Sequence, residues 1–350
     1  MTQTDIKSMT MDELTELILS MDEKKFRAKQ VYKWLHKELA DDYGVMSDLS
    51  KSLRGELDKS CPLYGVKELD RLSSAKDGTE KYLFALHDDN VIESVLMRYK
   101  HGNSVCISSQ VGCNMGCRFC ASTVDGCVRS LTASEMLSQV YAIQKSCGER
   151  ISNVVVMGSG EPLDNFDPLL RFIELITDEN GLDISQRNIT VSTCGLVPKI
   201  YELAQKKLQI TLAISLHASN DEKRRELMPV AKVYSIARLM EACRYYFNET
   251  GRRVTFEYAL VAGKNDGEQD AVELAALLKG MGAHVNLIPV NPVTESSLRR
   301  PGMKSCEHFR DLLLSRHVNA TIRRELGSDV NAACGQLRRS YYKGQRTGSC

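Results

Sequence analysis

The sequence predicts an α/β fold in which a parallel sheet closes into a partial barrel of six strand–helix units. From about residue 104, short apolar, β-branched runs alternate with segments of helical periodicity, which is typical of a parallel sheet. Glycine and polar residues follow several of these runs. In a barrel such positions share one open end, where the active sites of that fold lie. A doubly wound sheet is the alternative, and the partial barrel explains the pattern better.

A small helical unit precedes the barrel. Thr10 and Glu13 have the spacing of a capping box before the helix MDELTELILSM, and a second helix covers roughly residues 25–40. Residues 62–100 look extended, and their clearest strands are KYLFAL and VIESVLM. We therefore expect four parts: a helical accessory domain over 1–60, an extended connection over 61–98, the barrel with a C-terminal cysteine loop over 99–340, and a flexible tail over 341–350.

The barrel accounts for most of the predicted elements. Thr132 and Glu135 give its first helix a capping box. The predicted strands are SVCISS, NVVVM, NITVST, ITLAISL, VTFEYALV and VNLIPV, and the predicted helices lie near 132–147, 167–179, 198–207, 235–250, 268–281 and 305–316.

Composition places the chain among ordinary globular proteins. It has 350 residues, of which 43% are hydrophobic and 26% charged. The first residues lack the basic and apolar regions of a signal peptide, and no apolar run approaches the roughly 18 residues that span a bilayer. We therefore expect a cytoplasmic protein that does not associate with membranes.

Basic residues are unevenly distributed. The net charge is only +1, which argues against a protein wrapped in nucleic acid. Residues 299–350, however, contain eleven Lys or Arg against four Asp or Glu, and residues 24–37 contain six Lys or Arg, no acidic residue and three aromatic side chains. Such segments suit phosphate neutralisation and base stacking. For residues 24–37 the alternative is a solvated helix face whose aromatic side chains turn into the core.

Three of the twelve cysteines form the motif CNMGCRFC, at Cys113, Cys117 and Cys120. In a reducing compartment a clustered set of thiols indicates metal binding rather than disulfides. Structural zinc needs four protein ligands, and no second pair follows Cys120. Three thiolates on a four-iron cluster leave one iron open. This CxxxCxxC spacing after the first barrel strand is typical of the radical S-adenosylmethionine superfamily, whose open iron binds S-adenosylmethionine.

Further motifs sharpen the resemblance. The segments CISSQVGCNMGCRFCAST, MGSGEPLDN, VSTCGLVP, SLHA, LIPVNPV and AACGQLR occur in this order. Together they resemble the RlmN/Cfr family of RNA adenine methyltransferases, and the resemblance covers essentially the whole chain. It implies a partial radical S-adenosylmethionine barrel with a helical N-terminal unit.

The resemblance also implies the cofactors and their ligands. A [4Fe-4S] cluster is expected on Cys113, Cys117 and Cys120, and two S-adenosylmethionine molecules are expected per turnover. The expected contacts to S-adenosylmethionine are Gly160, Glu161, Ser192, Ser215, Leu216, His217 and Asn291.

The family chemistry gives three more residues a role. C2 of adenine is electron-poor and does not attack a sulfonium methyl group. In the family a cysteine thiolate, here Cys334, first becomes S-methylcysteine, because thiolates are strong nucleophiles. A radical from the second S-adenosylmethionine then removes hydrogen from that methyl group, and the carbon radical adds to the adenine. By resemblance Cys106 helps to resolve the adduct, which leaves a disulfide, and Glu93 accepts a proton.

The expected substrates also follow from the resemblance. They are C2 of one adenosine in the peptidyl-transferase region of 23S rRNA and C2 of the adenosine beside the anticodon in certain tRNAs. Family members that modify C8 of the same rRNA adenosine and confer antibiotic resistance are the alternative, and Pro162 in the segment GEP favours C2. We also expect an electron donor such as flavodoxin or ferredoxin, and a monomer.

Two other hypotheses remain. In the first, the protein is a non-catalytic iron–sulfur or zinc RNA-binding protein, which needs a fourth protein ligand and consumes no S-adenosylmethionine. In the second, it is another radical S-adenosylmethionine enzyme, such as a glycyl-radical activase, which has no need for Cys106 together with Cys334.

Overall fold

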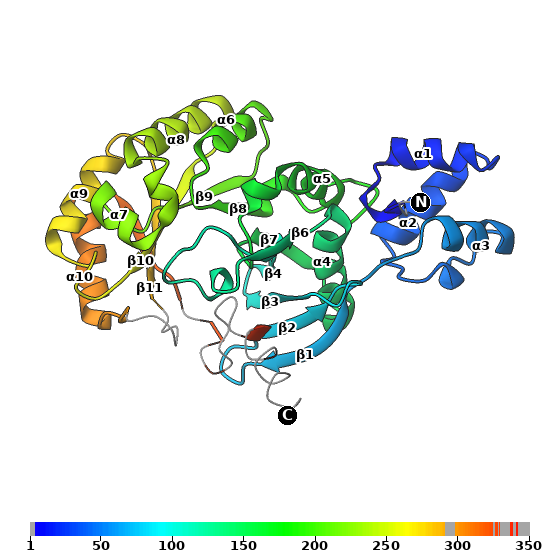
Figure 1. The fold of residues 1–350 in the computed structure, drawn as a ribbon, viewed down its shortest axis with the longest axis horizontal. Coiled ribbons are helices and arrows are strands. Elements are labelled where there is room, and N and C mark those ends of the chain that lie inside the picture. Colours follow the sequence, from blue (N-terminus) through cyan, green and yellow to red (C-terminus); the bar gives the residue numbers. More distant parts are fainter. Residues whose placement is uncertain are drawn as a thin grey trace.

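The computed structural model describes residues 4–290, 298–324, 326, 327, 329, 337, 338 and 341. Its centre is a ten-stranded sheet with the order β1-β2-β3-β4-β7-β8-β9-β10-β11-β12, which curves into an open barrel with helices outside (Figure 1). The strands of this sheet are β1 Lys67–Ser73, β2 Glu80–Ala85, β3 Val91–Tyr99, β4 Gly102–Ile107, β7 Ile151–Val156, β8 Ile189–Thr193, β9 Thr211–Ser215, β10 Val254–Leu260, β11 His284–Pro289 and β12 Asn319–Ile322. No helix in the described ranges is long and apolar enough to cross a membrane.

The fold class predicted from the sequence is confirmed. Strands β4 and β7 to β12 pair in parallel, and the six predicted barrel strands correspond to β4 and β7 to β11. The sequence did not predict one further strand, β12, which follows the six units, pairs with β11 and is the seventh parallel strand of the described residues. Its sequence NATI is short and only alternately buried, so it lacks the apolar run that marked the others.

Three antiparallel strands extend the barrel sheet at its first edge. The predicted strands KYLFAL and VIESVLM correspond to β2 and β3, which pair with each other, and β3 also pairs with β4. The strand β1 was not predicted separately because most of its side chains are exposed and polar. A second, two-stranded sheet consists of β5 Gln110–Gly112 and β6 Cys127–Ser130, and it brackets the cysteine motif.

Helices cover the outer face of the barrel. Their starts follow local capping chemistry: the Thr132 side chain accepts from the Glu135 N–H at 3.2 Å, and the Glu135 carboxylate accepts from the Thr132 N–H at 3.0 Å. Thr10 and Glu13 make the same capping box, as predicted. The helices are α1 Met11–Ser20, α2 Phe26–His36, α3 Lys51–Ser60, α4 Ala133–Cys147, α5 Phe166–Ile176, α6 Val197–Gln205, α7 Asp221–Leu227, α8 Ile236–Thr250, α9 Glu268–Leu278 and α10 Met303–Leu314.

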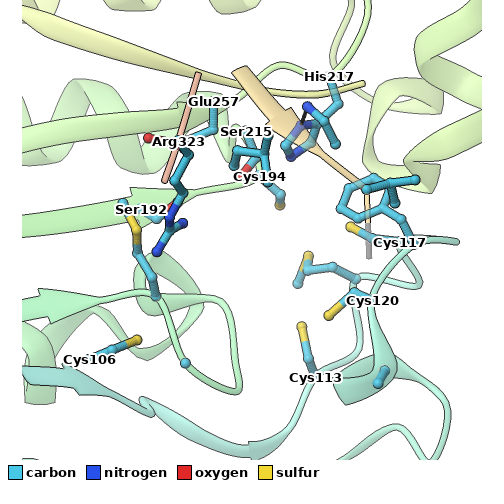
Figure 2. Close-up of a pocket in the computed structure, with 18 of the residues that line it drawn as sticks. Cys106, Cys113, Cys117, Cys120, Ser192, Cys194, Ser215, His217, Glu257 and Arg323 are labelled. Atoms are coloured by element: carbon cyan, nitrogen blue, oxygen red, sulfur yellow. Dashed lines mark hydrogen bonds between the residues drawn. The ribbon is translucent and has the colours of Figure 1, made fainter. Parts of the chain in front are cut away.

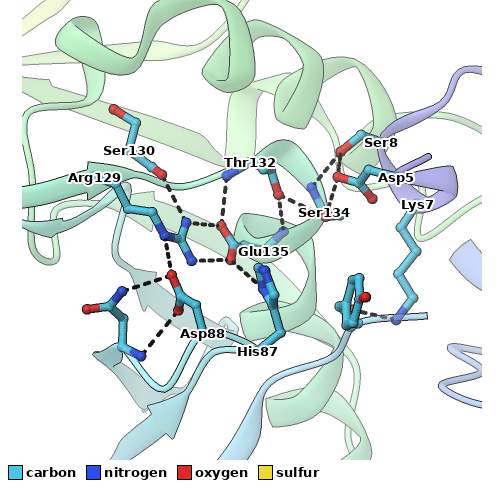
Figure 3. Close-up of polar contacts among 12 residues, drawn as sticks. Asp5, Lys7, Ser8, His87, Asp88, Arg129, Ser130, Thr132, Ser134 and Glu135 are labelled. Atoms are coloured by element: carbon cyan, nitrogen blue, oxygen red, sulfur yellow. Dashed lines mark hydrogen bonds and ion pairs between the residues drawn. The ribbon is translucent and has the colours of Figure 1, made fainter. Parts of the chain in front are cut away.

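The helices α1 to α3 form a unit beside α4 and α5, at the end of the molecule opposite α9 and α10 (Figure 1). Asp5 accepts from the Ser134 hydroxyl at the start of α4, and Ser8 accepts from the Ser134 N–H (Figure 3). Arg171 of α5 donates two hydrogen bonds to the Glu13 carboxylate, at 2.7 and 2.8 Å. These contacts attach the helical unit to the outer helices α4 and α5 of the barrel.

The segment 24–37 combines both structures considered for it. Tyr32 is fully buried, as expected for an aromatic side chain that turns into the core, and the Trp34 Nε1–H donates to Asp48. Phe26, in contrast, is 51% exposed with the Arg27 guanidinium over its ring. Lys29 and Lys33 are exposed, so a basic and partly aromatic face remains on the surface.

Candidate active site

One cavity of about 360 Å³ opens at the carboxyl ends of the parallel strands (Figure 2). It collects most of the residues that the sequence had singled out, although they come from distant parts of the chain. Those that line it are Cys106, Cys113, Cys117, Cys120, Gly160, Glu161, Ser192, Ser215 and His217. The predicted residues Asn291 and Cys334 lie outside the described residues.

The cysteine loop is fixed at its base by the small β5–β6 sheet. The Cys113 N–H donates to the Gly126 carbonyl at 2.9 Å. Gly112 has a positive φ of 82°, and a Cβ atom there would lie 2.0 Å from the Gly126 oxygen, so only glycine fits. On the other side the Arg118 N–H donates to the Leu227 carbonyl. The loop therefore presents the Cys113, Cys117 and Cys120 side chains to one cavity, as Figure 2 shows.

The chemistry of these thiols fits an iron–sulfur cluster. Burial raises the pKa of the Cys113 thiol to about 12 and that of the Cys117 thiol still further, so cluster binding must release their protons. Among the described residues no three Cys, His, Asp or Glu side chains converge as the ligands of a single ion do. In a four-iron cluster each thiolate binds a different iron, so three sulfurs spread around a cavity suit it.

Glycines bring the loop after β7 against the end of β4. A Cβ atom on Gly158 would lie 2.7 Å from the Ile107 oxygen, and one on Gly160, whose φ is 111°, would lie 2.6 Å from the Ser109 hydroxyl. The buried Glu161 that follows is thereby held at the cavity wall.

The Glu161 carboxylate links the ends of two neighbouring strands. The carboxylate accepts from the Cys194 N–H at 2.7 Å and from the Leu163 N–H at 3.1 Å. The backbone N–H of Glu161 donates to the Gln110 side chain. Burial raises the pKa of Glu161. Part of the hydrogen-bonding capacity of this carboxylate is therefore used on the backbone, which fixes the geometry before any ligand binds.

His217 is held as a neutral hydrogen-bond donor. Its backbone is left-handed, with a φ of 56°, and its Nδ1 accepts from the Ala259 N–H at 2.8 Å. Burial lowers the pKa of His217 to about 3, so the ring stays neutral and carries its proton on Nε2. The Phe119 ring packs edge-on against it, with 4.6 Å between centroids.

The remaining contacts predicted for S-adenosylmethionine divide into two kinds. Ser192 at the end of β8 and Ser215 at the end of β9 are partly exposed to the cavity. Leu216 instead points into the hydrophobic core and is fully buried. Only its backbone remains for polar contacts, and its N–H donates to the Glu257 carbonyl.

Cys106 lies in β4, across the cavity from the cysteine loop (Figure 2). It packs with Val95 and Met97 of β3 in a small apolar cluster. Neighbouring β2 and β3 carry a buried ion pair, in which the Lys81 Nζ lies 3.0 Å from the Glu93 carboxylate. Glu93 is buried and does not face solvent.

Described residues on both sides of Cys334 are bonded to this antiparallel part of the sheet. The Arg338 N–H donates to Glu93 at 2.5 Å, and the Gly327 N–H donates to Asp77 at 2.9 Å. Asp329 accepts from the Ser74 hydroxyl at 2.7 Å. The turn between β1 and β2 and the end of β3 thus form a platform for the C-terminal segment.

Sequence interpretation missed several polar residues at the cavity. Glu257 of β10 is buried, its pKa is raised by burial, and it accepts from the Asn286 side chain. A carboxylate within the otherwise apolar run VTFEYALV was the available signal. The other missed lining residues include Cys194, Arg300, Arg323 and Arg324, and the three arginines belong to the basic region 299–350.

Two models of known protein families match parts of the chain. The family model of the ribosomal RNA large subunit methyltransferase N-terminal domain matches residues 4–63. The model of the radical SAM superfamily matches residues 107–275, which include the cysteine loop and the ends of β7 to β10.

Whole-length relatives were also found. A probable dual-specificity RNA methyltransferase RlmN from Lachnospira eligens is 57% identical over 97% of each chain. One from Clostridium perfringens is 54% identical over 97% of this chain and 98% of its own. The crystal structure of a radical SAM methyltransferase from Sphaerobacter thermophilus superposes with a TM-score of 0.91 at 42% identity, and it covers 95% of this chain and 98% of its own.

Proposed function

The chain belongs to the RlmN family of radical S-adenosylmethionine RNA methyltransferases, and from this premise we propose that it methylates C2 of adenine in both 23S rRNA and tRNA. The observation that carries the proposal is the cavity that joins the three cysteines of the loop to Cys106. A cluster site alone fits many radical enzymes, whereas a further thiol facing it fits a reaction that passes through a protein–RNA adduct.

We assign the cluster to Cys113, Cys117 and Cys120. These residues would hold the cluster, which would supply the electron for reductive cleavage of a C–S bond of S-adenosylmethionine to methionine and a 5′-deoxyadenosyl radical. The carboxyl ends of β7 to β9 hold the cofactor through Gly160, Glu161, Ser192, Ser215 and His217, together with the backbone of Leu216. The neutral His217 provides an N–H donor that does not change its charge near neutral pH.

The methyl carrier is Cys334 in this proposal, and Cys106 is the resolving thiol. Arg338 is bonded to Glu93 on β3, the strand beside the one that carries Cys106. Four residues of chain span at most about 14 Å, so this tether limits how far Cys334 can move from β3. Glu93 is the proton acceptor, and Lys81 holds its carboxylate in place.

Pro162 is our argument for C2 rather than C8. It lines the cavity and begins the short 3₁₀ helix Pro162–Asn165, directly after Glu161. Proline at this first position fixes the backbone next to the cofactor contact.

The partners follow from the substrate. The accessory domain, residues 1–60, and the arginines at the cavity rim, Arg300, Arg323 and Arg324, are the proposed RNA-binding surfaces, since their charges neutralise phosphates. Asn291 completes the proposed S-adenosylmethionine contacts. The enzyme works in the cytoplasm as a monomer and receives its electrons from a donor such as flavodoxin or ferredoxin.

One experiment tests the activity and its position on the base. Anaerobically reconstituted protein is incubated with S-adenosylmethionine, a reductant and an unmodified 23S rRNA fragment or tRNA, and the digested nucleosides are compared with 2-methyl- and 8-methyladenosine by mass spectrometry. The 2-methyl product from both RNAs is expected. The 8-methyl product would overturn the assignment based on Pro162, and no product from a protein with an intact cluster would refute the substrate.

A second experiment tests the methyl carrier. The variant Cys334→Ala should form no methylated RNA and still cleave S-adenosylmethionine, because the cluster ligands are unchanged. Methylated product from this variant would refute the route through S-methylcysteine.

A further inference from the structure

Arg224 in α7 is a fully buried cation with an unusual set of partners. Its relative exposure is 0%, and it is among the largest fully buried side chains of the described residues. Buried charges are normally paired with an opposite charge, because taking an unpaired ion out of water is costly. Within the described residues, however, no carboxylate lies at ion-pair distance from Arg224, and every hydrogen bond recorded for it goes to a backbone carbonyl.

Those carbonyls belong to the wall of the cavity. The Nε donates to Leu216 at 3.1 Å, and Nη2 donates to Cys194 at 2.7 Å and to Ser215 at 3.3 Å. A fourth bond runs from Nη1 to Tyr234 at 3.4 Å. One guanidinium thus bonds the backbone at the carboxyl ends of both β8 and β9, next to proposed S-adenosylmethionine contacts. The fixed fork of donors in arginine suits this task, which the single ammonium of lysine cannot perform.

The same helix lies behind the cysteine loop. Cys117 and Cys194 pack in one apolar cluster with Leu227 and Met228, which end and follow α7. The Arg118 N–H donates to the Leu227 carbonyl, so the loop is tied to the helix that carries Arg224.

We propose that Arg224 is the counter-ion built into the protein for the iron–sulfur cluster, and that it also positions the strand ends which hold S-adenosylmethionine. The proposal rests on the cluster assignment made above. A four-iron cluster on three thiolates is negatively charged, and it becomes more negative when it takes up an electron. A positive charge in a dry environment stabilises the reduced form and raises the reduction potential. The cluster also supplies the negative charge that Arg224 otherwise lacks.

The test compares three variants of the full-length, anaerobically reconstituted protein. Arg224→Gln removes the charge, Arg224→Lys keeps the charge and loses the fork, and Arg225→Gln is the matched control, because Arg225 is the next residue of α7 and is exposed. Three quantities are measured: iron bound per chain, the midpoint potential of the cluster followed by electron paramagnetic resonance, and the dissociation constant of S-adenosylmethionine.

The counter-ion role and the positioning role predict different changes in potential and in affinity among the three variants. In Arg224→Gln the midpoint potential should shift to a more negative value, whereas Arg224→Lys and Arg225→Gln should stay close to the unsubstituted protein. The dissociation constant of S-adenosylmethionine should rise about tenfold in both Arg224 variants, since each loses hydrogen bonds between a charged group and the strand ends. It should not change in Arg225→Gln.

Each opposite result is decisive. An unchanged potential in Arg224→Gln would overturn the counter-ion role, and so would loss of the cluster from Arg224→Lys, because lysine keeps the charge. Unchanged S-adenosylmethionine affinity in Arg224→Lys would overturn the positioning role. Unsubstituted protein that binds no cluster would instead refute the proposed function.

Discussion

The two walls of the cavity are built in different ways. The cofactor wall, defined by Glu161, Cys194 and His217 after β7 to β9, consists of polar groups that are bonded to backbone N–H groups and carbonyls. The thiol wall, defined by Cys106 with Val95 and Met97, is a small apolar cluster on β3 and β4. A ligand that is bound and released in every cycle needs donors and acceptors fixed in advance, whereas a thiol that forms bonds to carbon and sulfur needs protection from competing polar groups.

The largest effect should come from a cluster ligand beside the cofactor wall. Cys117→Ala should lose the colour and the iron of the anaerobically purified protein, and with them both S-adenosylmethionine cleavage and methylation. Cys127→Ala is the control, because this cysteine lies in β6 and not at the cavity. Full iron content in Cys117→Ala would show that the loop does not hold the cluster.

On the thiol wall, Cys106→Ala should stop turnover at a later stage. S-adenosylmethionine cleavage should persist while a covalent protein–RNA species accumulates, since the resolving thiol is missing. Labelled RNA on a denaturing gel measures this species. Cys147→Ala removes a thiol at the end of α4, which does not line the cavity, and should turn over normally. Normal turnover by Cys106→Ala as well would remove the distinction between the two walls.

The buried ion pair between Lys81 and Glu93, next to the thiol wall, should contribute to the free energy of unfolding. Lys81→Met removes the cation that pairs with the buried Glu93 carboxylate and should cost about 3–5 kcal/mol of unfolding free energy, measured by urea unfolding. Adding Glu93→Gln should recover part of this loss, because the buried negative charge disappears. The exposed Lys67→Met on β1 is the control and should cost little. Equal losses for Lys67→Met and Lys81→Met would contradict the argument.

The cofactor wall should respond to acid through His217. Burial lowers its pKa from 6.5 in the unfolded chain to about 3, so the unfolded chain takes up a proton first as the pH falls. The stability contributed by neutral His217 is therefore present above pH 6.5 and lost between pH 6.5 and 3. Between pH 6.5 and pH 5 the free energy of unfolding of the unsubstituted protein, measured by urea unfolding, should fall by about 2 kcal/mol more than that of His217→Asn. Parallel pH profiles of the two proteins would contradict this assignment.

The smallest effect should arise far from both walls. Charge reversal at Lys29 and Lys33 of α2 should raise the RNA dissociation constant by about tenfold or less at low salt, and leave S-adenosylmethionine cleavage unchanged. Reversal of Lys206 and Lys207, two exposed lysines after α6, is the matched control. RNA affinity that does not change would refute the placement of RNA on the helical unit.

Sequence patterns predicted the cofactor wall better than the surroundings of the thiol wall. Residues at strand ends follow from periodicity, so the places of Glu161, Ser192 and Ser215 could be deduced. The hydrogen-bond partners of Glu161 and of Arg224 could not be deduced from the sequence, because these bonds join strands and a helix that are far apart along the chain. The segment RRELMP gave no sign that its first arginine is buried while the second is exposed. β12 was missed for lack of an apolar run.

The platform of β1 to β3 also bears on the order in which the site is assembled. Its bonds to the C-terminal segment join residues 245, 250 and 255 positions apart. Contacts of such separation carry the highest loop-closure entropy, and a chain emerging from the ribosome offers its N-terminal part first. We therefore expect the cysteine loop and the cofactor wall to be complete before the C-terminal segment docks, so a nascent chain has the site for radical generation before it has the site for methyl transfer.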